Sequence, residues 1–226
     1  MSKFASLCLL AYKRPIQLRE CLNTLLATID YPSEIIVNLD TDDSGNLEYL
    51  TDLYRKGKIS KLITSGGNNR GVGRSLANCI GISEGDLIFK IDTDLSFSPG
   101  WLSKAVWALE ELPEIGAISL FDYNHYDPND TRFNHYDELK DYWLVDDFVS
   151  SIYGFRKSYL DIGGWWEDDG FHKKIQASGV HLAITKKDYV KNSGFGVGKS
   201  TYVSGTEESP FKTPTHDRPL VFHDTI

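Results

Sequence analysis

The amino-acid sequence predicts an α/β fold, in which a mainly parallel sheet carries helices on both faces. Short apolar runs alternate with amphipathic stretches whose apolar residues recur at helical spacing throughout residues 4–121. The stretches between successive runs are long enough to hold a helix, and such βαβ units produce parallel strands. With 226 residues, the chain is long enough for one domain of this kind with a long functional tail.

The first half of the chain contains the clearest elements. Apolar runs predict strands at residues 4–11, 34–39, 59–64, 86–91 and 115–121. Apolar residues at helical spacing predict helices at residues 15–26, 47–57, 73–82 and 98–111. Pro15 supports the start of the first helix, and Ser98 with Pro99 is expected to begin the last one.

The pattern weakens after residue 123. Residues 124–144 are polar and aromatic without a clear period, and a strand-pair element is expected within 145–155. Helices are expected at 156–162 and 167–178. Beyond residue 186 the chain is rich in Gly, Ser and Thr, which predicts a lid or tail rather than a packed layer.

The composition of the chain argues against several classes of protein. The formal net charge of −8 argues against a general nucleic-acid binder, which is expected to carry a basic surface. The three cysteines lack the spacing of metal ligands and are expected to be buried thiols in a reducing compartment. No apolar stretch has the length of a membrane span or signal peptide, so we expect a cytoplasmic protein, with peripheral attachment to a membrane left open.

Two carboxylates stand two positions apart where a buried strand ends. Asp92 and Asp94 follow the apolar run at residues 87–89. Side chains so close would repel each other unless a cation lay between them, and hard divalent cations prefer oxygen ligands. A metal that holds a polyphosphate is one interpretation, and an Asp-rich turn is the other.

Other polar residues follow neighbouring strands. Asp40 ends the second strand, where its carboxylate could accept a hydrogen bond from a nucleotide base. The loop after the third strand offers glycines for close backbone approach and the guanidinium groups of Arg70 and Arg74 for phosphates. Because ligands bind outside the carboxyl ends of parallel strands, these residues are expected to meet Asp92 and Asp94 in one cleft.

The same segments resemble a known family. Residues 10–15 (LAYKRP) are similar to the opening strand end of family 2 glycosyltransferases with the GT-A fold. Residues 34–40 resemble their second strand with its nucleotide-binding aspartate, residues 69–78 their N-x-G-x-x-x-A-x-N segment, and residues 89–94 their metal-binding D-x-D. Residues 155–165 resemble the F-R-R…G-G-F segment, and Glu167-Asp168 with Gly179 the E-D…A-G spacing of the catalytic base. These matches are collinear over roughly residues 4–185.

The resemblance implies a domain organisation and a donor site. Residues 1–185 would form the GT-A domain, with a nucleotide-sugar half (1–97) and an acceptor half (98–185), and residues 186–226 a tail or lid. The implied donor contacts are Ala11, Tyr12, Arg14, Asp40, Asp42, Asn69, Arg70, Gly71, Arg74, Asp92 and Thr93. Mn²⁺ or Mg²⁺ would be held by Asp92, Asp94 and His223, with Asn192 and His216 as alternatives for the third ligand.

The resemblance also implies a reaction. A sugar would pass with inversion from a nucleotide sugar, with a UDP-sugar expected, to an acceptor hydroxyl, with Asp168 as general base. Trp165, Trp166 and Glu167 would lie on the acceptor side. A glycan acceptor is expected, and a protein side chain or a hydroxylated DNA base stays open, as does the oligomeric state. A metal-dependent nucleotidyltransferase and a non-catalytic nucleotide- or glycan-binding module are the alternative functions.

Overall fold

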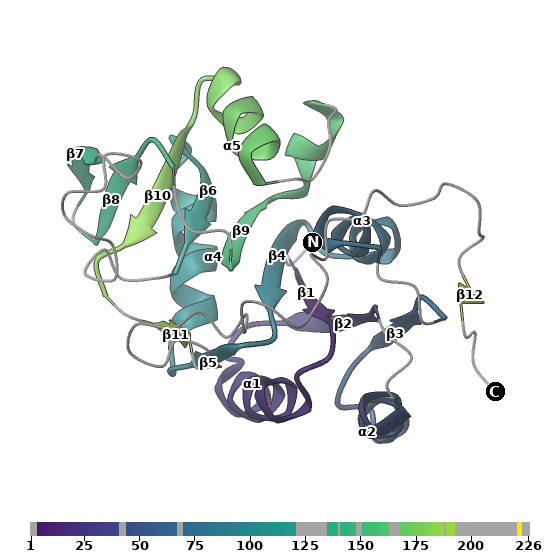
Figure 1. The fold of residues 1–226 in the computed structure, drawn as a ribbon. Coiled ribbons are helices and arrows are strands. Elements are labelled where there is room, and N and C mark those ends of the chain that lie inside the picture. The colour runs from purple at the N-terminus through teal and green to yellow at the C-terminus, as the bar shows by residue number, and fades with distance from the viewer. Residues whose placement is uncertain are drawn as a thin grey trace, which may run out of the picture.

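The computed structural model describes residues 4–40, 44–66, 70–120, 135–139, 141–147, 151–162, 168–187, 189–192 and 221–222. At residues 135–138, 161–162, 168–170, 192 and 221–222 it describes the backbone alone. These residues form a mixed ten-stranded sheet with helices packed against it and a separate two-stranded sheet, which confirms the predicted α/β class (Figure 1).

The first half of the chain builds the parallel part of a ten-stranded sheet. Its strands are β1 (Ala5–Ala11), β2 (Ser33–Leu39), β3 (Lys61–Thr64) and β4 (Leu87–Asp92), and its helices are α1 (Pro15–Thr28), α2 (Ser44–Arg55) and α3 (Val72–Ile82). Leu39 lies opposite both Ala11 and Thr64, and Leu10 lies opposite Asp92. The carboxyl ends of the four strands therefore share one edge, as the sequence predicts.

The second half extends the sheet mainly by antiparallel pairs. Its elements are β5 (Leu95–Phe97), α4 (Trp101–Glu111), β6 (Ile115–Ser119), β7 (His135–Leu139), β8 (Tyr142–Val145), β9 (Ile152–Arg156), a 3-10 helix (Lys157–Ile162), α5 (Asp168–Ala177), β10 (His181–Thr185), β11 (Val190–Asn192) and β12 (Val221–Phe222). The strand order is β12-β3-β2-β1-β4-β9-β6-β10-β8-β7. Strands β7 and β8 lie within a region where the sequence shows no strand period, because short strands rich in aromatic residues give only a few alternations.

The start of α4 differs from the expectation. The helix begins at Trp101, and Gly100 before it adopts a left-handed conformation with φ 87°. Ser98 does not cap the helix; its backbone N–H donates to the Tyr189 carbonyl, 2.8 Å away. A glycine turn has replaced the predicted side-chain cap because Ser98 pairs with the chain segment that leads into β11.

Helices cover both faces of the sheet. Helices α1, α2 and α4 pack on one face, where Leu22, Leu50 and Trp101 join the odd-numbered residues of β1 in one core cluster. Helices α3 and α5 pack on the other face through residues such as Leu76 and Ile175. Figure 1 shows α1 and α2 on the opposite side of β1–β3 from α3. Buried apolar surface of this kind supplies most of the stabilisation of the fold.

Two short strands near the C-terminus return to the body of the protein. Strand β11 pairs antiparallel with β5, which places the backbone of Asn192 opposite Leu95. Strand β12 pairs antiparallel with β3 and forms the edge of the ten-stranded sheet. The sequence predicts neither strand. Within the described residues, no helix is both long and apolar enough to cross a membrane.

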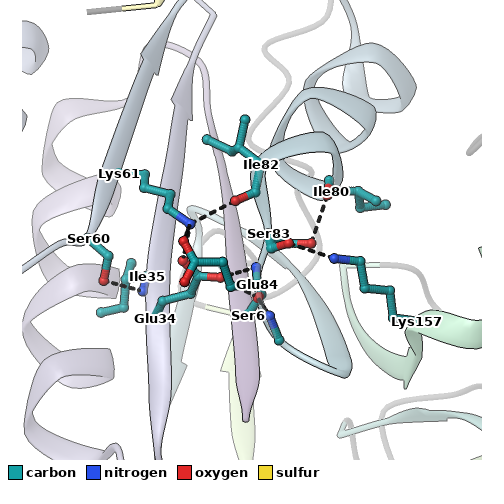
Figure 2. Close-up of polar contacts among 11 residues, drawn as sticks. Ser6, Glu34, Ile35, Ser60, Lys61, Ile80, Ile82, Ser83, Glu84 and Lys157 are labelled. Carbon is teal, nitrogen blue, oxygen red and sulfur yellow. Dashed lines mark hydrogen bonds and ion pairs between the residues drawn. The ribbon is translucent and has the colours of Figure 1, made fainter. Parts of the chain in front are cut away.

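A polar network joins the strands at the edge opposite their carboxyl ends (Figure 2). The buried carboxylate of Glu34 on β2 accepts hydrogen bonds from the Ser6 hydroxyl (2.6 Å) and the Glu84 N–H (2.7 Å). It also pairs with Lys61 of β3 at 2.7 Å. Lys61 donates in turn to the Ile82 carbonyl at the end of α3. Burial raises the pKa of Glu34, but these hydrogen bonds outweigh it and leave the pKa below its ordinary value.

Candidate functional site

Asp40 stands directly after β2 and organises the start of α3. Its backbone N–H donates to the Ala11 carbonyl at 2.8 Å, and the residue is only 4% exposed. Carboxylate oxygen Oδ2 accepts hydrogen bonds from the N–H groups of Arg70 and Gly71 and from the Ser75 hydroxyl. Asp40 therefore fixes the turn that leads into α3, although it lies 30 positions before Arg70, a role that the sequence does not predict.

The second carboxylate oxygen of Asp40, Oδ1, has a different hydrogen-bonding environment. Oδ1 is buried and has no hydrogen-bond partner in the geometry of the described residues. Burial raises the pKa of Asp40, and the nearby Ser65 hydroxyl and the donors at the start of α3 lower it by less, so the pKa stays above its ordinary value. A buried acceptor without a donor suits the predicted contact with a base N–H.

Arg14 reaches the second acid of the D-x-D segment. Its Nη1 atom donates to Asp94 Oδ2 at 2.8 Å, although 80 positions separate the two residues. Both side chains are partly exposed, at 26% for Arg14 and 16% for Asp94. Arg14 and the preceding Lys13 have positive φ angles of 50° and 52°, which are strained for residues with side chains. The Asn46 amide of α2 donates to the Lys13 carbonyl at 3.0 Å and helps to hold this turn.

Asp92, the first acid of the D-x-D segment, forms an ion pair with a lysine. Lys90 Nζ lies 2.7 Å from Asp92 Oδ1, and the lysine side chain is only 2% exposed, in the middle of β4. The sequence pattern had not led us to expect this pairing. Residues two positions apart on a strand share a face, so a lysine inside an apolar run two residues before Asp92 is the signal that could have revealed it. Between the two acids, Thr93 is buried.

Further predicted donor contacts lie around the same edge. Ala11 is buried at the end of β1, and the Tyr12 side chain that follows is 36% exposed. Gly71, with φ 80°, occupies a backbone conformation that glycine adopts readily. Arg70 and Arg74 flank it, partly exposed, and no ion pair joins either guanidinium to a residue that the structure describes. The structure thus brings the predicted residues of four loops to one edge of the sheet.

The acceptor half is described less completely. Asp168, the predicted general base, is the first residue of α5, and only its backbone is described. One turn later on α5, His172 is buried and its Nδ1 lies 2.9 Å from Asp147 Oδ1. The remaining predicted site residues, which lie outside the described residues, are Asp42, Asn69, Trp165, Trp166, Glu167 and His223.

The oxygen ligands present suit a hard divalent cation. Asp92 and Asp94 supply two carboxylates, and the described residues contain no cluster of three or more His, Cys, Asp and Glu side chains. The backbone of Asn192 lies opposite Leu95, the residue after Asp94. Donors of this chemistry fit Mn²⁺ or Mg²⁺, although each acid is already paired with a basic side chain.

Comparison with known proteins agrees with this geometry. A model of the family described as "Glycosyl transferase family 2" matches residues 6–172. Among solved structures, S. aureus TarS in complex with UDP-GlcNAc is 20% identical, with a TM-score of 0.64 over 83% of this chain and 57% of that one. A mannosyltransferase from Pyrobaculum calidifontis, solved with GDP-Man and Mn²⁺, is 17% identical, with a TM-score of 0.62 over 80% of this chain and 56% of that one.

A third structure, GalNAc-T7 with UDP, GalNAc and Mn²⁺, is 13% identical, with a TM-score of 0.66 over 83% of this chain and 43% of that one. The chain therefore spans about half the length of these structures. No curated protein sequence matches the chain. At these identities the structures establish a shared GT-A fold, and the family model covers most of the chain. The chain belongs to glycosyl transferase family 2.

Proposed function

We propose that the protein transfers a sugar, with inversion, from a UDP-sugar to a hydroxyl group of a glycan. The observation that carries the proposal is the gathering of Asp40, Arg14, Asp92 and Asp94 at the carboxyl edge of the parallel strands. Ligands of open α/β sheets bind at this edge. Membership of glycosyl transferase family 2 and neighbours solved with nucleotide sugars support the same reaction class.

Different residues would recognise the base and the phosphates of the donor. The Oδ1 atom of Asp40, which has no hydrogen-bond partner among the described residues, would accept the N3–H of uracil, and the exposed Tyr12 ring would lie against the base. Arg70 and Arg74, which pair with no carboxylate among the described residues, would contact the phosphates near the start of α3. Because GDP-Man occupies one of the related structures, the choice of uracil rests on Asp40 alone.

Asp92 and Asp94 would hold Mn²⁺ or Mg²⁺, with Asn192 as the preferred third ligand because β11 places its backbone beside the residue after Asp94. His223 and His216 remain alternatives. When bound, the metal would neutralise the charge of the departing diphosphate. Asp168, at the start of α5, would accept the proton of the attacking hydroxyl.

A panel of nucleotide sugars tests the proposal. The protein is incubated with UDP-, GDP- and dTDP-sugars, Mn²⁺ and a mixture of oligosaccharides, and released nucleoside diphosphate is measured. We expect release from a UDP-sugar that stops with EDTA. Release from none of the donors would contradict the proposed transfer, and release from a GDP-sugar alone would contradict the assignment of Asp40 to uracil.

A pair of neighbouring acids tests the general base. Loss of a general base lowers turnover by about 10²–10⁴-fold. Asp168→Asn should show this loss while it still binds UDP, and Asp169→Asn, a matched change one residue further along α5, should retain turnover. Full activity in Asp168→Asn together with loss in Asp94→Asn would remove the base assignment and leave the metal assignment intact.

A further inference from the structure

Each acid of the D-x-D segment has a basic side chain as its partner. Asp94 pairs with Arg14 at 2.8 Å, and Asp92 pairs with Lys90 at 2.7 Å. The formal charges of these four side chains therefore sum to zero. Acids that served only as metal ligands would carry a net negative charge and would attract a cation to the free protein.

The two cations differ in how firmly the fold holds them. Lys90 is 2% exposed and lies in the middle of strand β4, so moving its ammonium group away from Asp92 would break a buried ion pair. Arg14 is 26% exposed and lies in a loop, directly before α1. A partly exposed guanidinium can exchange one oxyanion for another at little cost, because water solvates it on the way.

The backbone of the loop that contains Arg14 is held in a defined conformation, which fixes the direction of the Arg14 side chain. Lys13 and Arg14 both hold strained left-handed backbone conformations, and Asn46 of α2 fixes the carbonyl of Lys13 at 3.0 Å. Strain of this kind persists only where surrounding contacts maintain it, and it occurs frequently at functional sites. The position of Arg14 next to Asp94 is therefore specified by two helices and is not an incidental surface contact.

We propose that Arg14 is a displaceable counter-ion of Asp94 that keeps divalent-metal affinity low until a donor diphosphate arrives. In the free protein the guanidinium occupies the carboxylate that a metal needs. When metal and diphosphate bind together, Arg14 moves from Asp94 to a phosphate oxygen, so metal and nucleotide favour each other's binding. Lys90 stays on Asp92 as a positioning residue. The role of the diphosphate rests on the proposed function, whereas the competition between Arg14 and metal does not.

Mn²⁺ binding to the free protein tests the competition. The electron paramagnetic resonance signal of free aqueous Mn²⁺ gives the dissociation constant for the wild type, Arg14→Gln and Lys56→Gln. Lys56 lies in an exposed ion pair on the α2 surface, and its replacement changes the net charge equally. We expect Arg14→Gln to bind Mn²⁺ about tenfold more tightly, which is the effect of losing a partly buried competing charge, and Lys56→Gln to bind as the wild type does.

An equal Mn²⁺ affinity in all three proteins would overturn the proposal, as would equal tightening in both variants, which would indicate a general charge effect. Thermal unfolding checks that Arg14→Gln is folded, and Arg14→Ala serves as a second variant. A further titration adds UDP. The wild type should bind Mn²⁺ at least about tenfold more tightly with UDP than without it, and this gain should shrink in Arg14→Gln. If UDP has no effect on the wild type, the proposed function fails and the first titration still decides the role of Arg14.

Discussion

Glu34 and Asp40 are two buried carboxylates at opposite ends of the same strand, and their pKa values move in opposite directions. Glu34, at the start of β2, is hydrogen-bonded to Ser6, Glu84 and Lys61, and its pKa is lowered. Asp40, just beyond the end of β2, leaves one oxygen without a hydrogen-bond partner in the described residues, and its pKa is raised. The lowered value marks a group that stabilises the fold, and the raised value marks a candidate binding group.

The raised pKa of Asp40 predicts a specific pH dependence. The folded protein holds the proton of Asp40 more tightly than the unfolded chain does, so this group's contribution to stability is present below the unfolded pKa and is lost as the pH rises through the folded value. Relative to Asp40→Asn, the wild type should lose free energy of unfolding as the pH rises from about 4. Urea unfolding of both proteins across this range measures the difference, and a difference that moves in the opposite direction would contradict the assignment.

Glu34 should behave in the reverse manner. Its folded pKa is depressed, so its stabilisation is present above the unfolded pKa and is lost as the pH falls through the folded value. Glu34→Gln should lower the free energy of unfolding by about 1–3 kcal/mol at neutral pH, because it breaks a buried, hydrogen-bonded ion pair. The deficit should shrink below about pH 4. A deficit that does not depend on pH would show that the charge of Glu34 contributes nothing.

At the scale of the elements, β4 links the core to the candidate site. Phe89 is fully buried on β4, three residues before Asp92, and lies opposite Gly154 of β9. A Cβ atom added at Gly154 would lie 2.3 Å from the Phe89 ring. Strand β9 approaches the central strand this closely because position 154 has no side chain.

Gly154→Ala should therefore lower the free energy of unfolding by about 1–3 kcal/mol, since the buried Phe89 ring would have to leave its position. Gly81→Ala is the matched control. Gly81 lies within α3, and a Cβ added there meets nothing within 4 Å. This substitution should stabilise the protein by about 0.5–1 kcal/mol through helix propensity. Equal effects of the two substitutions in urea unfolding would contradict the packing argument.

The sequence predicts helices and strands best where a regular pattern of apolar residues continues over a long segment and marks one buried face. Strands β1 to β4 and helices α1 to α3 follow the expected ranges closely. The short strands β5, β7, β8, β10, β11 and β12 escape prediction, because two to five residues give too few alternations. In addition, β5 pairs with β11, and β12 pairs with β3, across long distances in sequence. The predicted start of α4 was wrong for a related reason, since the Ser98 N–H donates a hydrogen bond to the carbonyl of Tyr189, which is distant in sequence.

At the scale of the whole molecule, the topology explains why part of the site could be predicted. Parallel strands end at one edge, so the acids at the ends of β2 and β4 had to lie along the same edge, and Asp40, Asp92 and Asp94 do so. The pairing of Arg14 with Asp94 spans 80 residues, and the hydrogen bond from the Arg70 N–H to Asp40 spans 30. Neither contact follows from local pattern, because both depend on how loops from different βαβ units meet.

We expect this edge of the sheet to bind a nucleoside diphosphate together with a divalent metal held by Asp94. Calorimetric titration of UDP into the protein, with Mn²⁺ and again with EDTA, tests it most directly. Asp94→Asn is compared with Asp52→Asn, which removes an equal charge from an exposed ion pair on α2. We expect saturable binding that requires Mn²⁺, is lost in Asp94→Asn and is retained in Asp52→Asn. Absence of binding by UDP and by every other nucleoside diphosphate, or binding that survives in Asp94→Asn unchanged, would contradict it.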